Sequence, residues 1–270
     1  MLEISNLYKS FNTGTINEVN ALQDVSLSVG DGSFVCVLGT NGSGKSTLLN
    51  AIAGTFISDA GTIILNGRNI TRLPEHKRAC QIGRVFQNPF SGTAPGMSIS
   101  ENLALAAKRG KKRGLGWGLP VSVVRDLKSR VKALNMGLEE RMNTQIGKLS
   151  GGQRQALTLL MASWLKPDLL LLDEHTAALD PTTAGKVIEM TKQIVTDYKL
   201  TTLMVTHSMQ QAVNLGNRII MMHQGKIKYD FSGEEKNKMK VPDLLSLFDE
   251  LRRKDQIDAG EALLLSAKHV

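Results

Sequence analysis

The sequence predicts an α/β fold around a parallel sheet, with an antiparallel β layer at the N-terminus and an inserted α-helical subdomain. The apolar runs in FVCVLG, LLLLDE and TTLMVTH carry this prediction. An uninterrupted apolar run bounded by polar residues is typical of a strand buried on both faces, as strands of parallel sheets are. Helical patterns lie between these runs, and alternation of strands with helices is typical of a parallel sheet.

The segments on either side of FVCVLG predict the first elements. Residues 2–35 contain the β-like segments LEISNL and ALQDVSLSV, which indicate a small antiparallel layer. From Lys45 the pattern KSTLLNAIAG predicts a helix that stops at Gly54, and TIILNG predicts a further strand. Residues 88–118 pass from loop chemistry to a basic, glycine-rich end. We interpret them as the start of an inserted subdomain that continues through a helix over 122–134.

The rest of the chain resumes the alternation and ends in a tail. After Gly152 come LLLLDE, a helix over 184–198, the strand TTLMVTH, a short helix and RIIMMHQGKIKYD. From about Ser232 the chain is charged, and its apolar residues recur at helical spacing, which predicts a helical tail. These apolar residues are Leu244, Leu247, Phe248 and Leu251.

Composition limits the classes of protein that fit. With 270 residues and 41% hydrophobic content, the chain can bury a sizeable core. No stretch approaches the apolar length that crosses a bilayer, and the N-terminus lacks a secretion-signal pattern, so we expect a cytoplasmic chain. Cys36 and Cys80 are expected to be reduced packing residues. The charge of +8 favours anionic partners without defining a site, and 4% aromatic content weakens the case for base stacking.

GTNGSGKST matches the pattern G-x-x-x-x-G-K-[ST] between a predicted strand and a predicted helix, which is the context that a phosphate-binding P-loop requires. Its glycines let backbone N–H groups close around phosphate oxygens, and the helix N-terminus adds its positive end. Lys45 is expected on the β- and γ-phosphates, and the Ser46 hydroxyl on Mg²⁺. The predicted nucleotide-binding residues are Gly39, Thr40, Asn41, Gly42, Ser43, Gly44, Lys45, Ser46 and Thr47. The fold prediction is therefore a P-loop NTPase (RecA-like) core; the alternative is a glycine-rich connector that happens to hold a lysine.

The two acids that end LLLLDE gain separate roles from this triphosphate site. Asp173 follows the buried strand at the edge where open α/β sheets bind ligands, and it is placed to hold the Mg²⁺ shell. Glu174 points elsewhere and is free to polarise the attacking water. Taken alone, the pair also fits solvated acids at a strand end, and the triphosphate site decides in favour of metal ligand and base.

LSGGQRQ has a structural and a functional interpretation. Ser150 and Gln153 satisfy the S-x-x-Q capping box before an apolar helix. That box does not need Gly151 and Gly152, whereas a helix N-terminus without side chains can bring bare N–H groups and a serine hydroxyl against a phosphate. With GTNGSGKST upstream and LLLLDE downstream, residues 1 to about 230 resemble the ATP-binding subunit of an ABC transporter.

The resemblance implies roles for further residues. Gln87 in VFQNP matches the glutamine that touches Mg²⁺ and the attacking water and links the site to the transmembrane partner. His207 in MVTHS matches the histidine that contacts the γ-phosphate and the catalytic glutamate. Asp180 in ALD matches an aspartate that communicates across the dimer. Phe11 in YKSF matches the aromatic residue that stacks on adenine, and Tyr8 is close enough to leave that assignment open.

The resemblance also implies partners. Two subunits of this family pack head to tail, so that ATP on the P-loop of one is covered by Ser150, Gly151, Gly152 and Gln153 of the other. The implied complex adds transmembrane permease subunits and an extracytoplasmic substrate-binding protein at the cytoplasmic face of the membrane, with peripheral attachment and no nucleic acid. The implied ABC ATPase domain spans 1–235, with its core in 1–87 and 156–235 and a helical subdomain at about 88–155. Residues 236–270 form the tail.

Some features depart from the family pattern. His175 stands where most members have proline, and ALTLLMA follows LSGGQRQ where many have an arginine-containing helix. Every catalytic position is filled, so we expect ATP hydrolysis. The combination of LPEHKRA, IGRVFQ, ALTLLMA and DEHTAALDP is similar to ATPase subunits of substrate-binding-protein-dependent importers, some of them for aromatic amino acids.

Two other classes of ATP-binding protein fit the sequence less well. A soluble ABC ATPase that acts on ribosomes or DNA usually carries two cassettes or a long coiled-coil insertion, and this chain has neither. A nucleotide sensor without hydrolysis conflicts with the intact Glu174 and His207. The separate, unfused ATPase favours import.

The basic run KRGKKRG, residues 108–114, has two interpretations. We expect a solvated helix end, or a contact with anionic headgroups or a permease loop, and the two are compatible.

Overall fold

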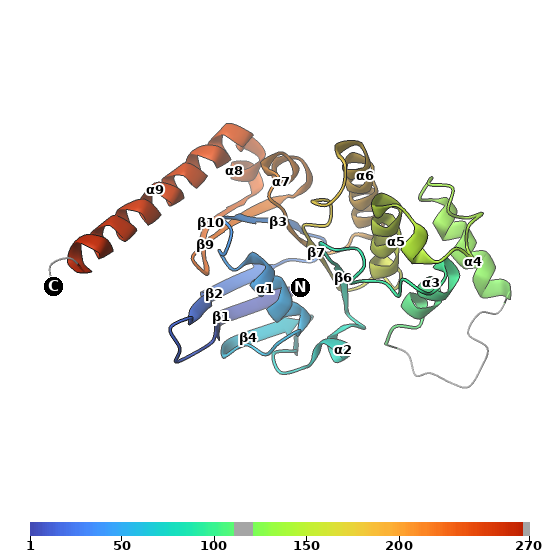
Figure 1. The fold of residues 1–270 in the computed structure, drawn as a ribbon, viewed down its shortest axis with the longest axis horizontal. Coiled ribbons are helices and arrows are strands. Elements are labelled where there is room, and N and C mark those ends of the chain that lie inside the picture. The colour runs from blue at the N-terminus through green and yellow to red at the C-terminus, as the bar shows by residue number, and fades with distance from the viewer. Residues whose placement is uncertain (111–120, 267–270) are drawn as a thin grey trace.

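A computed structural model describes the backbone of residues 1–110 and 121–266, and the side chains of 1–110 and 124–253. Its strands form two sheets, with helices between and around them (Figure 1). The strands are β1 (Leu2–Phe11), β2 (Val19–Val29), β3 (Phe34–Gly39), β4 (Ala60–Leu65), β5 (Arg68–Asn69), β6 (Ile82–Val85), β7 (Leu169–Asp173), β8 (Thr202–Val205), β9 (Arg218–His223) and β10 (Lys226–Ser232). The helices are α1 (Lys45–Ala53), α2 (Glu75–Arg78), α3 (Ile99–Ala107), α4 (Val121–Lys132), α5 (Gly151–Ser163), α6 (Pro181–Tyr198), α7 (Met209–Leu215), α8 (Gly233–Lys238) and α9 (Val241–Ser266), with a 3₁₀ turn η1 (Ile146–Lys148).

The larger sheet is the parallel sheet that the sequence predicts. Its strand order is β10-β9-β3-β8-β7-β6, and all its neighbours pair in parallel except β9 and β10. The leucines of β7 divide between its two faces: Leu169 and Leu171 belong to the core cluster that includes α1, and Leu170 and Leu172 to the cluster that includes residues of α5, α6 and α7. All four are fully buried, which confirms a strand covered on both sides.

The antiparallel layer is also confirmed, and it is wider than the sequence pattern indicates. Its order is β2-β1-β4-β5, so the strand predicted in TIILNG joins it as β4. Strand β1 runs to Phe11 and not only through LEISNL. The register shifts between Ile4 and Leu7, where Asn6 adopts a φ of 47°. Such a bulge interrupts the period-2 alternation, so the sequence pattern stops early.

The inserted helical subdomain has a core of its own. Residues of α3, α4 and α5 build a third cluster with the segment before α5, and these helices lie together at one end of the molecule (Figure 1). Helix α3 starts at a capping box between Ser98 and Glu101. The domain boundaries given above stay a prediction. The basic run 108–114 lies partly outside the described residues, and its role stays a prediction too.

Helix α6 and Cys80 differ from the predictions. The helix begins at Pro181 and not at Ala184, because Asp180 caps it by accepting a hydrogen bond of 3.0 Å from the Thr183 amide, and proline fits the first helical position. Cys36 is a buried packing residue as predicted, and burial raises the pKa of its thiol to about 12. Cys80 is also a free thiol, but it is exposed, so its predicted packing role is wrong. It follows the short surface helix α2, outside any apolar run.

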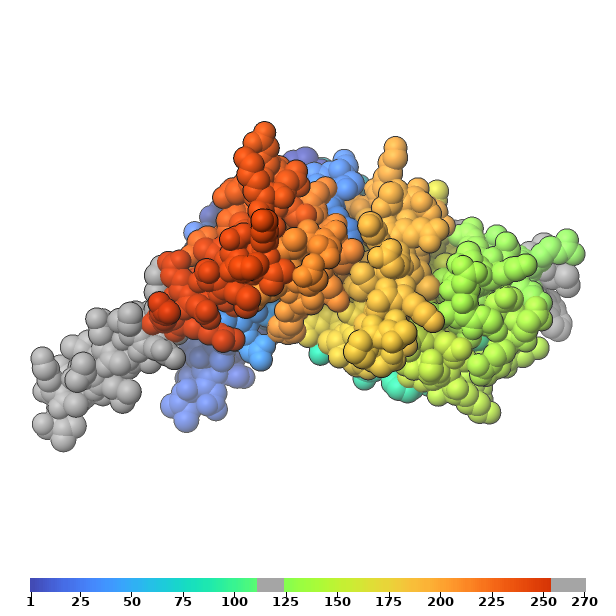
Figure 2. Space-filling view, turned by 90° about the horizontal axis from the view of Figure 1, so that it is seen from above, coloured from blue at the N-terminus to red at the C-terminus, as the bar shows by residue number. Residues whose placement is uncertain are grey.

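The predicted helical tail is confirmed in α8 and α9. Leu244, Phe248 and Leu251 are buried in the cluster that covers one face of the parallel sheet, and Leu247 packs against it. Figure 2 shows the red segment, which includes the start of α9, lying against the orange segment that contains α7. No helix in the described part of the chain is long and apolar enough to span a bilayer.

Candidate functional site

The P-loop connects β3 to α1 through a tight turn in which Gly42 and Gly44 adopt positive φ values. Gly44 precedes α1 with a φ of 97°, and a Cβ there would lie 2.4 Å from the Ala21 carbonyl oxygen, so only glycine fits. The Lys45 side chain is 5% exposed, and its Nζ donates to the carbonyls of Gly39 at 2.9 Å and Thr40 at 2.8 Å. Ser43 is buried, and its Oγ has no hydrogen-bond partner in the described structure. The loop thus brings the Lys45 ammonium and the N-terminus of α1 together, and both favour an anion.

Burial and charge act against each other on Lys45. Burial lowers the pKa of its ammonium, while the nearby carboxylates of Glu174 and Asp173 raise it. A polyphosphate in this loop would add negative charge beside Nζ and stabilise the charged form.

The depression over the P-loop collects most of the predicted residues. It is lined by Phe11, Val19, Ala21, Asn41, Gly42, Ser43, Gly44, Lys45, Ser46, Thr47, Glu174 and His207. Tyr8 is not among these residues, which favours Phe11 as the aromatic partner of a base. Phe11 is 37% exposed and meets Phe56 edge to face, with 5.4 Å between ring centroids. The contact with Phe56 holds the Phe11 ring in place, and part of the ring remains exposed.

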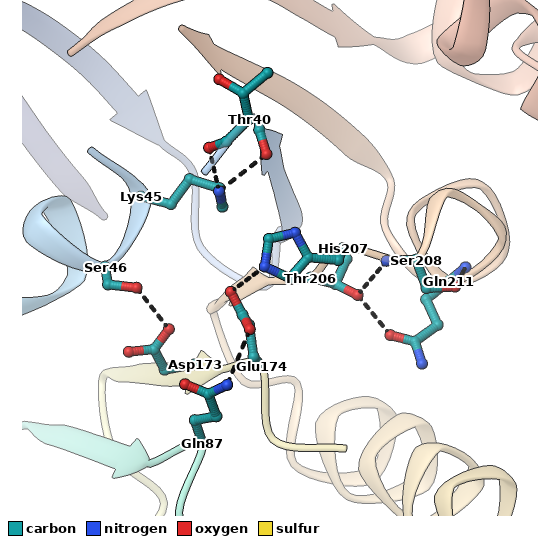
Figure 3. A network of polar contacts seen from close by, with 11 residues as sticks. Thr40, Lys45, Ser46, Gln87, Asp173, Glu174, Thr206, His207, Ser208 and Gln211 are labelled. Atoms are coloured by element: carbon teal, nitrogen blue, oxygen red, sulfur yellow. Dashed lines mark hydrogen bonds and ion pairs between the residues drawn. The ribbon is translucent and has the colours of Figure 1, made fainter. Parts of the chain in front are cut away.

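Asp173 and Glu174 lie beside each other and face different groups (Figure 3). Asp173 Oδ1 accepts a hydrogen bond of 3.2 Å from the Ser46 hydroxyl. Burial raises the pKa of Asp173, and the Ser46 hydrogen bond and the Arg84 charge oppose that shift. Glu174 Oε1 lies 2.6 Å from His207 Nε2, and its Oε2 accepts from the Gln87 side-chain amide at 3.3 Å.

The backbone of Glu174 explains this divergence. Its φ of 45° is left-handed, which is uncommon for a residue other than glycine, asparagine or aspartate. Its amide donates to the Val205 carbonyl on β8 at 3.0 Å, so the neighbouring strand holds the conformation. A strained residue of this kind costs about 1–3 kcal/mol and persists where the surroundings fix it. The turn sends Asp173 toward Ser46 and Glu174 toward His207 and Gln87.

A network of polar side chains supports the turn that carries His207 (Figure 3). The sequence pattern does not predict this network. The Thr206 hydroxyl donates to Gln211 Oε1 at 2.7 Å and accepts from the Ser208 amide at 3.0 Å. Gln211 Nε2 then donates to the Thr176 hydroxyl, on the loop after Glu174, at 3.3 Å. The S-x-x-Q spacing of SMQQ marks the start of α7, and nothing in it points to Thr206 or Thr176, so sequence reasoning misses both.

His175 ties the loop after Glu174 to α6. It is 2% exposed, and its Nε2 lies 3.0 Å from the Thr191 Oγ1. Because the Thr191 hydroxyl donates to the Val187 carbonyl at 2.8 Å, the histidine is the donor of the shared hydrogen bond. Burial lowers the pKa of His175 to about 4, so the imidazole is neutral at pH 7.

The LSGGQ motif lies apart from the P-loop depression. Ser150 Oγ accepts from the Gln153 amide, and Gln153 Oε1 accepts from the Ser150 amide, each at 3.3 Å, so the capping box forms as the pattern predicts. A Cβ on Gly152 would lie 1.9 Å from Thr183 Cγ2, so this glycine has a packing reason within the chain, while Gly151 is exposed. Ser150 and Gln153 line a different groove, along α6.

Comparisons with known proteins agree with this geometry. Residues 22–177 match the ABC transporter family. The chain is 43% identical over 250 residues to the tyrosine transport ATP-binding protein of Clostridioides difficile, which covers 92% of this chain and 99% of that protein. It is 34% identical over 237 residues to the spermidine/putrescine import ATP-binding protein PotA of Haemophilus influenzae, covering 87% of this chain and 59% of that longer protein. A solved dimeric ATP-binding cassette, bound to ADP and Pi in a post-hydrolysis state, shares 28% identity and a TM-score of 0.74, covering 86% of this chain and 98% of that one.

A P-loop, paired acids, a capped LSGGQ helix and these matches lead to the same conclusion as the sequence motifs. The chain belongs to the ABC transporter family as an ATP-binding subunit, and it hydrolyses ATP to drive transport.

Proposed function

We propose that the chain binds ATP with Mg²⁺ on its P-loop, closes head to tail with a second copy, and hydrolyses ATP with Glu174 as the general base. The observation that carries this proposal is the position of the Glu174 carboxylate, held by His207 and Gln87 at the edge of the P-loop depression. A base must lie within hydrogen-bonding reach of the water that it deprotonates, and this carboxylate faces the depression where the γ-phosphate would lie.

The donor set of the site fits Mg²⁺. The Ser46 hydroxyl and the Asp173 carboxylate lie 3.2 Å apart, and the Gln87 amide contacts Glu174, the residue next to Asp173. These are the hard oxygen donors that Mg²⁺ prefers, and the ion usually takes few of them from the protein because phosphates and waters complete its shell. When bound, Mg²⁺ neutralises charge on the β- and γ-phosphate oxygens.

The side chains divide the work of hydrolysis. Glu174 accepts a proton from the attacking water as the water oxygen bonds to the γ-phosphorus and the bond to ADP breaks. His207 holds one oxygen of that carboxylate, and Gln87 holds the other, which fixes its direction. Lys45 is placed to compensate charge that develops on the phosphates.

Dimerisation is supported by the separation of the LSGGQ motif from the P-loop. A phosphate on the P-loop leaves Ser150 and Gln153 unused in the same chain, because they line a groove along α6. The solved relatives include cassettes described as dimeric. In a head-to-tail dimer, Ser150, Gly151, Gly152 and Gln153 of one copy cover the nucleotide of the other, and Asp180 lies at the interface.

The names of the relatives support a proposal about the cargo. Relatives are named for import of spermidine and putrescine and of methionine, and the 43% identical relative for tyrosine transport. We therefore infer that the transporter imports an amino acid, and the tyrosine transport relative favours an aromatic one. We also infer that its other parts are permease subunits and an extracytoplasmic binding protein. In this proposal the chain is attached peripherally to the cytoplasmic face of the membrane. Its ATPase domain spans residues 1–235, with a helical subdomain at about 88–155, and residues 236–270 form the tail.

The test is Glu174→Gln, with Glu235→Gln on the exposed start of α8 as the matched control. Glutamine keeps the shape of the side chain and cannot take the proton, so turnover should fall by about 100- to 10,000-fold while ATP still binds. Size-exclusion chromatography in MgATP should then show a trapped dimer that the control does not form. Wild-type turnover in Glu174→Gln refutes its role as the base.

A further inference from the structure

The N-terminal part of α5 contacts the segment that carries Gln87 at a residue before Gln87 and at a residue after it. We call residues 86–90 the Gln87 segment. Gln155 is fully buried, and its side-chain amide donates to the Phe86 carbonyl at 3.3 Å. Arg154 is 5% exposed, and its guanidinium carbon lies 3.6 Å from the centroid of the Phe90 ring. Gln87 therefore sits between two points that the same helix holds.

Arg154 also holds the loop that leads into Ser150. Its Nε donates to the Ile146 carbonyl at 3.3 Å, and its Nη2 donates to the carbonyls of Gly147 at 3.2 Å and Leu149 at 2.9 Å. These donors satisfy carbonyls directly before the LSGGQ helix. Because the guanidinium is planar, its edge can bind the carbonyls while its face stacks on Phe90.

Backbone contacts continue the connection beyond the side chains. The Gly147 amide donates to the Pro95 carbonyl at 3.0 Å, which joins the loop before α5 to the loop after the Gln87 segment. A Cβ on Gly92 would lie 2.8 Å from Thr158 Cγ2, so the chain after Phe90 lies directly on α5. The two loops and the helix start have little room to shift relative to one another.

We propose that Arg154 and Gln155 form a clamp that fixes the Gln87 segment to the start of the LSGGQ helix, so that both act on hydrolysis through Gln87. They are positioning residues, because their contacts are with the Gln87 segment and with the loop before α5. The inference rests on the proposed function, in which Gln87 serves the nucleotide of its own chain and Ser150 that of the partner. The clamp then links the two nucleotide sites of the dimer through one chain, since a displacement of Ser150 is passed to Gln87.

Phe90 offers a test that spares the fold, because it is 45% exposed. Phe90→Ala removes the stacking face, and kcat for ATP should fall roughly two- to thirtyfold, the range of a cation–π contact. The affinity for MgADP, measured by titration, should stay unchanged because the P-loop is intact. Phe90→Tyr keeps the ring and should retain the wild-type kcat. Leu105→Ala removes a similarly exposed apolar side chain, 41% exposed on α3, and serves as the control.

A double-mutant cycle separates positioning from general damage. If the clamp acts through Gln87, then Phe90→Ala causes no further loss of kcat in a Gln87→Ala background. Arg154→Lys loses the planar fork and also its bonds to the loop before α5, so it should lower kcat at least as much as Phe90→Ala. A wild-type kcat in Phe90→Ala, or losses that multiply in the double variant, would overturn the proposal.

The outcome can also be told apart from failure of the proposed function. If Gln87→Ala alone hydrolyses ATP at the wild-type rate, the proposed role of Gln87 is wrong, whatever Phe90 does. Hydrogen exchange then still tests the clamp. Amides of residues 86–88 and 90 should exchange faster in Phe90→Ala than in wild type, with strand β3 unchanged. Equal exchange in both proteins would overturn the clamp itself.

Discussion

Acid should destabilise this protein through His175, because burial disfavours the charged imidazole in the folded state. The imidazole is buried, donates to Thr191, and has a pKa lowered by burial to about 4 from an ordinary value of 6.5. The folded pKa is below the unfolded one, so between these values the unfolded chain binds more protons. The free energy of unfolding therefore falls as the pH falls. The full contribution is present above pH 6.5, and about 3 kcal/mol is lost once the pH reaches the folded pKa.

His175→Gln supplies the measurement, because glutamine can donate to Thr191 and does not titrate. We expect the free energy of unfolding of wild type, relative to this variant, to drop by about 2 kcal/mol between roughly pH 7.5 and pH 5. Urea titrations followed by circular dichroism at several pH values measure it. His76→Gln, on the exposed surface of α2, controls for the loss of a histidine. If wild type and His175→Gln lose stability in parallel on acidification, the imidazole is not a buried neutral group and the reasoning fails.

Two further predictions concern the nucleotide site. Lys45→Ala should weaken ATP binding itself, because it removes a point charge from the β- and γ-phosphates; unchanged affinity in a binding titration would make GTNGSGKST a structural loop. Ser150→Ala should cost about 1 kcal/mol of stability as a lost helix cap, and turnover should fall far more than that loss explains if Ser150 also binds the partner's phosphate. Mixing Lys45→Ala with Ser150→Ala places both lesions in one site of a hybrid dimer and leaves the other intact, so subunit exchange should restore some hydrolysis. No recovery from exchanged subunits would count against a shared site, provided that one intact site can turn over alone.

The elements that the sequence predicts correctly are those whose signal is local. The apolar run of β7, the glycines before α1 and the capping box of α5 each lie within a few consecutive residues. Their chemistry also depends on backbone groups or on strand position, so the sequence alone is enough to place the P-loop and its acidic partner together. The end of β1 escapes such prediction because a bulge at Asn6 interrupts the alternation. The start of α6 has a local signal, Asp180 as the cap and proline at the first helical position, which a prediction from apolar spacing alone leaves out.

Features that depend on contacts between distant segments have no such signal. LSGGQRQ contains Arg154, but its partner Phe90 lies in another loop, and no spacing connects them. Gly152 is the opposite case, because here the sequence does offer an explanation. It suggests that a glycine is needed so that a phosphate can approach the backbone. Thr183 of α6 packs where a Cβ would stand, so the packing requirement alone accounts for a glycine there. The exposed Gly151 has a weaker requirement, since its Cβ would lie 3.3 Å from a terminal methyl group of a leucine, which can move aside.

Glu174 shows why the chemistry of the site is set by tertiary structure. Two adjacent acids at the end of a regular strand would project to opposite faces of the sheet, and one of them would leave the nucleotide edge. Instead, the left-handed backbone at Glu174, held by the Val205 carbonyl on β8, lets both carboxylates stay at that edge with separate neighbours. Local propensity disfavours this conformation for glutamate, so contacts such as the bond to β8 must stabilise it. The division between a metal ligand and a base therefore depends on the register of β7 against β8, which also fixes where the following loop delivers His175 to α6.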